Sequence, residues 1–302
     1  MLREPKTEFG ATETAIYRKL VQPDAPKLLT TKDAMETIVP TVSINSLTHS
    51  MSLLESKRVL KRIGKGVYLN RSTGLAPKIV DVIPWVFKGT RYYLGLNAIA
   101  NHWGLSPQIP YSYHVIYMPK NEAQRKRITS WCSMLNRFEK ELGGTLVPVL
   151  SRAGMSDKGV SQSIFEGSQL PISTIERTIV DTVIYTKEIG GAGEALTWAR
   201  AALSKSIDYA ELEQIAKKAY SSVKSVAVRL GFLLETASSE KPHDEVTDAL
   251  EKLVGELEEL VSKTRATYNW GREKRGSRYV EKWHLRVSSS YLRQLREVSR
   301  RE

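Results

Sequence analysis

SINSLTHSMSLLESKRVLKRIGKGVYLN (residues 43–70) is the stretch that decides the fold. Ser43 is a favourable N-cap, and four apolar residues follow it at spacings of three, four and three: Ile44, Leu47, Met51 and Leu54. This spacing predicts a helix with one buried stripe. Two β-prone runs then flank Gly64-Lys65-Gly66, a pattern that predicts a hairpin with a three-residue loop.

Two further helices are expected before this stretch. The apolar positions of residues 12–22 predict one helix and those of residues 30–39 predict a second, and prolines end both. Three helices followed by a basic hairpin are typical of a winged helix-turn-helix. We therefore expect an α+β protein, with a winged helix-turn-helix domain at 1–75 and a larger mixed α/β domain, rich in helices, at 76–302.

The larger domain is expected to alternate strands and helices. The expected strands are 78–87, 113–118 and 145–150, followed by a short strand near Trp283. The expected helices are 121–142, a run over 174–235 broken near Gly190-Gly191 and 204–208, 243–264 with a leucine seam, and one at the C-terminal end. The segment after residue 264 is basic and follows an acidic helix, so it either neutralises that helix or contacts nucleic acid.

Composition limits the classes of partner and site. The 302 residues include 45 Lys and Arg against 33 Asp and Glu, a formal net charge of +12 that favours an anionic partner. Cys132 is the single cysteine, which excludes an intramolecular disulfide and a cysteine-based zinc site. The five histidines form no HxxxH pair, so no metal site is expected. With no long apolar run and a polar N-terminus, we expect a cytoplasmic protein without a membrane partner.

The helix and hairpin of residues 43–70 are the best candidate for binding double-stranded DNA. Short polar side chains near a helix N-terminus can read base edges, and a cluster of cations on a wing can contact phosphates. The candidate DNA-binding residues are Thr31, Lys32, Ser43, Asn45, Ser46, His49, Lys57, Arg58, Lys61, Arg62 and Lys65. A protein-interaction module is the alternative, because winged helices serve that purpose too.

The sequence lacks the motifs of common enzymes. It has no GxxxxGK[ST] phosphate loop and no GxGxxG, GxSxG or HExxH motif. A nuclease-like pattern can be formed only from Asp33 with Glu55-Ser56-Lys57, which fall on helices and at the start of the hairpin. We therefore expect no catalytic residues and no cofactor, with a nuclease as the remaining enzymatic alternative. Glu176, Arg177 and Asp181 fit a buried ion pair and a helix cap better than an active site.

Several stretches resemble the AbiEi-type antitoxins, the transcriptional regulators of abortive-infection toxin–antitoxin systems. They are KRVLKRIGKGVYLN (57–70), RYYLGLNAIANHWGLSPQIP (91–110), ISTIERTIVDTV (172–183), VAVRLGFLLE (226–235) and KWHLRV (282–287). The resemblance implies a repressor that binds inverted repeats in its own promoter through the winged helix. It also implies an antitoxin that counteracts a nucleotidyltransferase-like toxin. The basic helix at 121–142 and the long C-terminal region depart from the simplest family pattern.

Overall fold

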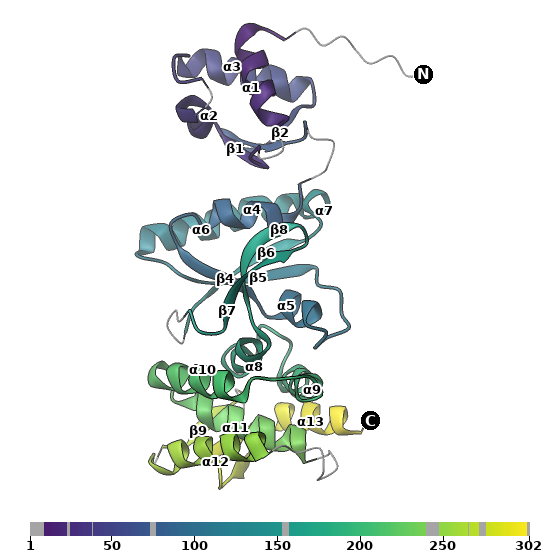
Figure 1. The fold of residues 1–302 in the computed structure, drawn as a ribbon, viewed down its shortest axis with the longest axis vertical. Helices are drawn as coiled ribbons and strands as arrows, with labels where there is room; N and C mark the ends of the chain where they lie inside the picture. The colour runs from purple at the N-terminus through teal and green to yellow at the C-terminus, as the bar shows by residue number, and fades with distance from the viewer. Residues whose placement is uncertain are drawn as a thin grey trace. The chain divides into compact units, whose positions relative to one another are not determined.

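The computed structural model describes residues 9–22, 25–37, 39–72, 77–152, 157–239, 248–264, 266–271 and 276–300. The expected mixed α+β class is confirmed (Figure 1). The chain forms two compact units. The first unit comprises Met1–Gly89 and Asn121–Leu146, and the second comprises Thr90–Lys120 and Val147–Glu302.

The first unit begins with a winged helix. Its elements are α1 (Ala11–Leu20), β1 (Leu28–Thr30), α2 (Thr31–Thr37), α3 (Ile44–Ser56), β2 (Leu60–Gly64) and β3 (Val67–Asn70). The strands form an antiparallel sheet in the order β1-β3-β2, and the helices bury Ile16, Leu20 and Leu47 in one core with Tyr68 of the sheet. The hairpin is confirmed, with a tighter loop than expected because Gly64 already pairs with Val67. The sequence did not predict β1, which is only three residues long.

The rest of the first unit is helical. It contains α4 (Ile79–Val86), α6 (Glu122–Leu135), a 3₁₀ turn (Asn136–Phe138) and α7 (Glu139–Leu142). The prediction of a strand at 78–87 was wrong, because a short apolar run fits a buried helix as well as a buried strand. The Asp81 carboxylate accepts a hydrogen bond from the Lys78 backbone N–H (2.8 Å) and so favours the helix start.

The compact units do not follow a single division of the chain after residue 75. Helix α4 packs against α6, with the rings of Trp85 and Trp131 edge to face at 4.2 Å, and both helices belong to the first unit. The expected helix at 121–142 is confirmed as α6, the 3₁₀ turn and α7, and Gly143 ends it in the left-handed conformation. Whether residues 1–75 act as a separate DNA-binding domain stays a prediction.

A five-stranded mixed sheet begins the second unit. Its order is β6-β5-β4-β8-β7, from β4 (Arg91–Gly95), β5 (Ser112–Met118), β6 (Thr145–Leu150), β7 (Val160–Phe165) and β8 (Ser168–Ser173). Strand β4 pairs antiparallel with β5 and parallel with β8. The short helix α5 (Asn97–His102) follows β4. The predicted strands at 113–118 and 145–150 are confirmed, whereas β4, β7 and β8 were not predicted.

Helices form most of the remaining chain. They are α8 (Ile175–Ile184), α9 (Ala192–Leu203), α10 (Tyr209–Ser222), α11 (Ser225–Ser238), α12 (Asp248–Ser262) and α13 (Ser289–Ser299), with short strands β9 (Tyr268–Trp270), β10 (Arg278–Val280) and β11 (Leu285–Val287) (Figure 1). The expected breaks in the run over 174–235 are confirmed. The predicted leucine seam comprises Val246, Leu250, Leu253, Leu257 and Leu260. Leu250, Leu253 and Leu257 are buried in the core of this unit and Leu260 is partly buried, whereas Val246 lies outside the described residues. No helix in the described ranges is long and apolar enough to cross a membrane.

Candidate nucleic-acid interface

Helix α3 presents a polar face beside the hairpin. Its Ser43 cap is confirmed, because the Ser43 hydroxyl accepts a hydrogen bond from the Ser46 backbone N–H (3.3 Å). The buried stripe is displaced from the expected one: Leu47, Ser50, Met51 and Leu54 are buried, and Ile44 is 51% exposed. The predicted spacing places Ser50 on the exposed face opposite the stripe, and that prediction was wrong because Ser50 is buried. The observed buried stripe begins at Leu47 and covers fewer turns of the helix than the predicted one, and Ile44 lies one turn before it.

Two of the proposed base readers extend from α3 without a local partner. Asn45 and His49 are exposed and lie four residues apart, on the same side of the helix. Ser46 is exposed too, but its hydroxyl accepts a hydrogen bond from the Ser43 hydroxyl (3.0 Å). Among the described residues, no hydrogen bond or ion pair is formed by the side chains of Asn45 and His49. The helix thus offers an amide and an imidazole to a ligand, whereas Ser43 and Ser46 bind each other.

The tip of the hairpin is fixed to the start of α2. The Thr31 backbone N–H donates to the Gly66 carbonyl (2.9 Å), and its hydroxyl is 3.4 Å from the same oxygen. At the base of the hairpin, the Glu55 carboxylate accepts a hydrogen bond from the Arg62 backbone N–H (3.2 Å). Thr31 therefore acts as an internal tie in this structure, and the hairpin is held at both ends. Lys32, by contrast, is exposed and pairs with Glu36 at 3.6 Å.

The five cations of the wing fall into two groups. Arg58, Arg62 and Lys65 are exposed, and none of them forms an ion pair within the described part of the chain. Lys57 instead pairs with Glu13 of α1 (2.7 Å) and lies over the Phe9 ring. Lys61 pairs with Glu141 of α7 and lies over the Phe138 ring. These two lysines tie the wing to its own unit, which leaves three cations for an external anion.

The nuclease-like residues are used locally. The Asp33 carboxylate accepts a hydrogen bond from the Thr30 hydroxyl (2.6 Å), and Glu55 binds the hairpin backbone. Among the described residues there is no group of three or more His, Cys, Asp and Glu side chains that could hold a metal ion. The carboxylates of Asp33 and Glu55 are therefore both held by contacts within the helices and hairpin.

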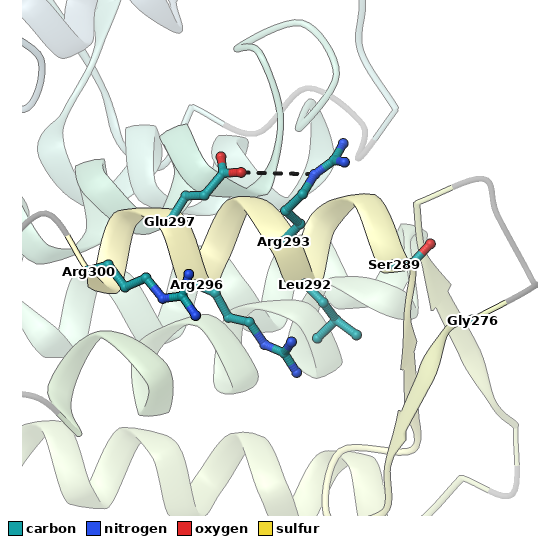
Figure 2. A pocket seen from close by; sticks show the side chains of 7 residues that line it. All are labelled: Gly276, Ser289, Leu292, Arg293, Arg296, Glu297 and Arg300. Carbon is teal, nitrogen blue, oxygen red and sulfur yellow. Dashed lines mark ion pairs between the residues drawn. The ribbon is translucent and has the colours of Figure 1, made fainter.

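A second basic surface lies on α13. Figure 2 shows Arg296 and Arg300 extending on the side of α13 that carries Leu292, whereas Arg293 and Glu297 extend on the other side. Arg293 and Glu297 are 4.0 Å apart and exposed. The expected neutralisation of the acidic helix is met in part, since Lys282 contacts Glu258 of α12 at 3.4 Å. The sequence shows that this segment is basic. It does not show which of its cations pair with acidic residues of the protein and which extend into solvent.

Comparisons with known proteins establish the fold. No protein family and no curated protein matches the sequence. The crystal structure of the RV2827C protein from Mycobacterium tuberculosis is similar, with a TM-score of 0.62 over 97% of this chain and 96% of that chain. The two sequences are 12% identical, so this likeness concerns the fold alone.

Proposed function

We propose that this protein is a sequence-specific DNA-binding repressor and the antitoxin of a toxin–antitoxin operon, of the AbiEi type. The observation that carries the DNA-binding part is the polar N-terminal face of α3 beside a wing with three exposed cations. The antitoxin part rests on the sequence resemblance. The net charge of +12 agrees with an anionic partner.

In this proposal, α3 enters the major groove with its N-terminal end against the bases. Asn45 reads adenine, since an amide can donate and accept at the N6 and N7 edge, and His49 reaches a neighbouring base or phosphate. Arg58, Arg62 and Lys65 contact phosphates, which hold the helix in register. A second copy on the other half of an inverted repeat raises the affinity through effective concentration.

The remaining candidates have narrower roles in this proposal. Ser43 and Ser46 shape the end of α3, Thr31 fixes the wing tip, and Lys57 and Lys61 hold the wing through ion pairs. Lys32 adds to the positive field beside α2. The partner is a nucleotidyltransferase-like toxin encoded beside this chain, and both proteins act in the cytoplasm.

The test is fluorescence anisotropy with a labelled fragment of the protein's own promoter and a scrambled fragment of the same length. Asn45→Ala with His49→Ala should weaken promoter binding by about 1–3 kcal/mol per lost base contact and leave scrambled DNA nearly unaffected. Arg62→Ala with Lys65→Ala should weaken both fragments alike. Lys205→Ala with Lys218→Ala, exposed lysines of the second unit, removes the same charge and should change neither.

Three outcomes contradict the proposal. Equal losses on both fragments from the Asn45/His49 change would show that α3 does not read sequence. If the Lys205/Lys218 control loses as much affinity as the Arg62/Lys65 variant, binding depends on the total positive charge and not on the wing. No shift of any duplex, even at low salt, would favour a protein-interaction module. Co-expression with the neighbouring toxin gene tests the antitoxin role separately, and continued growth arrest would refute it.

A further inference from the structure

A small pocket in the second unit brings together three cationic side chains from distant parts of the sequence. Its volume is about 180 Å³. Arg152 comes directly after β6, Lys187 follows α8, and Arg229 lies on α11. Asn269 and Tyr291 complete the rim. None of these residues belongs to the winged helix, so the DNA-binding proposal does not use the pocket.

Arg229 is a half-buried guanidinium that binds only backbone carbonyls. Its Nη1 donates to the Val183 carbonyl (3.1 Å), and its Nη2 donates to the Asn269 carbonyl (2.7 Å). Its Nε has no partner, and no carboxylate pairs with the side chain within the described ranges. Burial lowers the pKa of Arg229 against an opposing effect of Tyr291, and the nearby Arg152 lowers it further. The site therefore holds a cation without a counter-charge.

The side chain of Arg152 is held at the C-terminal end of α8, as is that of Arg229. Its Nη1 donates to the Ile184 carbonyl (3.3 Å), one residue along from the carbonyl that binds Arg229. Its Nη2 contacts the Glu188 carboxylate at 2.9 Å, and the guanidinium lies over the Tyr185 ring. Among the residues that the structure describes around the pocket, three cations and one carboxylate leave an excess of two positive charges. The last carbonyls of α8 hold both guanidinium groups in place, so little side-chain entropy remains to be lost when an anion binds.

We propose that this pocket binds the phosphate group of a small ligand, either inorganic phosphate or a phosphate monoester such as a nucleoside monophosphate. Two positioned guanidinium groups match the geometry of phosphate oxygens, and the excess of two charges matches a phosphate dianion. The volume is below the range typical of drug-sized ligands, which agrees with one phosphate group entering the pocket.

Isothermal titration of the full chain tests this site at constant ionic strength. Inorganic phosphate and adenosine 5′-monophosphate are the two probes, and adenosine is the control without phosphate. We expect saturable binding of at least one phosphate-bearing probe and none of adenosine. If only the monophosphate binds, the ligand is a monoester; if both bind equally, free phosphate suffices.

Two variants in the pocket and one outside it complete the test. Arg229→Gln and Lys187→Gln should each weaken phosphate binding by about tenfold or more, the usual effect of a lost charge-assisted hydrogen bond. Lys187 is exposed, so its variant keeps the test valid if Arg229→Gln fails to fold. Arg296→Gln, on the separate surface of Figure 2, removes the same charge and should have no effect.

Several results would overturn the site. These are the absence of saturable binding by either phosphate probe, binding of adenosine as tight as that of the monophosphate, and equal losses from Arg296→Gln and Lys187→Gln. The last result would assign the binding to general surface charge. Promoter binding is measured on other residues, so failure of one proposal leaves the other standing.

Discussion

Arg58 occupies a backbone position that usually belongs to glycine. Its φ is 60°, in the left-handed region, directly after the C-cap of α3. Its backbone N–H donates to the Glu55 carbonyl (2.9 Å), and the next N–H, of Val59, donates to the Leu54 carbonyl (3.0 Å). These two bonds form a Schellman motif, in which a side chain at the left-handed residue costs stability. Compared with glycine at this position, Arg58 therefore keeps a positive charge on the wing but lowers the stability of the fold.

Arg58→Gly should stabilise the fold and weaken DNA binding at the same time. We expect a gain of about 0.5–1 kcal/mol in the free energy of unfolding, because relief of left-handed strain exceeds the added entropy of the unfolded chain. Chemical denaturation measures the gain, and anisotropy on scrambled DNA measures the loss of affinity. Arg58→Asn, which also tolerates this conformation, should share both effects. Weaker DNA binding without any gain in stability would contradict the strain argument.

A buried histidine predicts how stability depends on pH. His114 of β5 is buried with its Nδ1 unpartnered, and burial lowers the pKa of the imidazole below its ordinary value of 6.5, although Glu188 opposes this effect. The folded chain therefore binds fewer protons at this site than the unfolded chain does. As the pH falls below about 6.5, the free energy of unfolding should decrease. His114→Gln should flatten this decrease in urea titrations at pH 7.5 and 5.5. Parallel losses in both proteins would exclude His114 as the cause.

At the scale of elements, four of the stretches quoted from the sequence contact each other in pairs. The Trp283 indole N–H of KWHLRV donates to Glu235 of VAVRLGFLLE (2.6 Å). The Tyr93 hydroxyl of RYYLGLN donates to Asp181 of ISTIERTIVDTV (2.8 Å). Burial, reinforced by Asp181, raises the pKa of Tyr93 well above its ordinary value, so the hydroxyl keeps its proton. All four stretches contribute buried residues to one hydrophobic core, although they are far apart in the sequence.

The buried ion pair expected from ISTIERTIVDTV is confirmed. Arg177 Nε donates to Asp181 at 3.1 Å, and both side chains are almost fully buried. Glu176 is not part of this ion pair. Its carboxylate accepts a hydrogen bond from the Asp208 backbone N–H (3.0 Å) and fixes the start of α10. The carboxylates of Asp181 and Glu176 are thus both hydrogen-bonded within the second unit.

Two glycines in helices should respond to alanine in opposite directions. A Cβ at Gly231 of α11 would overlap the Trp283 ring, whereas one at Gly255 of α12 would meet nothing within 4 Å. Gly231→Ala should therefore cost about 1–3 kcal/mol by overpacking, despite the better helix propensity of alanine. Gly255→Ala should add about 0.5–1 kcal/mol. Thermal unfolding measures both changes, and a stabilising Gly231→Ala would refute the packing of α11 against Trp283.

The sequence predicted elements whose pattern is local and missed those that depend on partners. Helix α3 and the hairpin follow from spacing, an N-cap and glycines, which act within a few residues. The run at 78–87 was assigned to the wrong class because a short run with six buried apolar residues fits a buried helix as well as a buried strand. Strands β7 and β8 have mixed polarity; β7 pairs with β8, and β8 pairs with β4, through backbone hydrogen bonds. The ion pairs of Lys57 and Lys61 join residues 44 and 80 positions apart, so no local pattern reveals them.

At the scale of the whole molecule, the count of available cations sets the salt dependence of DNA binding. Counting all five wing cations predicts four to six phosphate contacts and a slope of log K against log[salt] of about −4 to −5 per subunit. With Lys57 and Lys61 held in ion pairs, Arg58, Arg62 and Lys65 remain, and the expected slope is about −3. Filter binding over a range of salt concentrations separates the two values, and a flat response would exclude the wing as the phosphate contact.

Breaking one internal ion pair should steepen this slope. Glu141→Gln releases Lys61, and also Arg71, whose Nη2 lies 3.5 Å from the same carboxylate, so the slope should become more negative by about one to two. Glu139→Gln makes the same charge change two residues away on α7 and should leave the slope unaltered. Equal slopes in both variants would show that Lys61 does not contact a phosphate even when its ion pair with Glu141 is broken.

The path of the chain between the two units has a consequence for how the protein is made. The first unit is interrupted at Gly89 and resumes at Asn121, so Glu141 is synthesised 80 residues after its partner Lys61. At about 5–20 residues per second, translation takes roughly 4–16 s over that interval. During it, the emerging helix and hairpin carry four cations of the wing unneutralised rather than three, since only Glu13 has already been made. On the proposed function, the nascent chain on the ribosome therefore offers nucleic acid one more cation of the wing than the finished protein does.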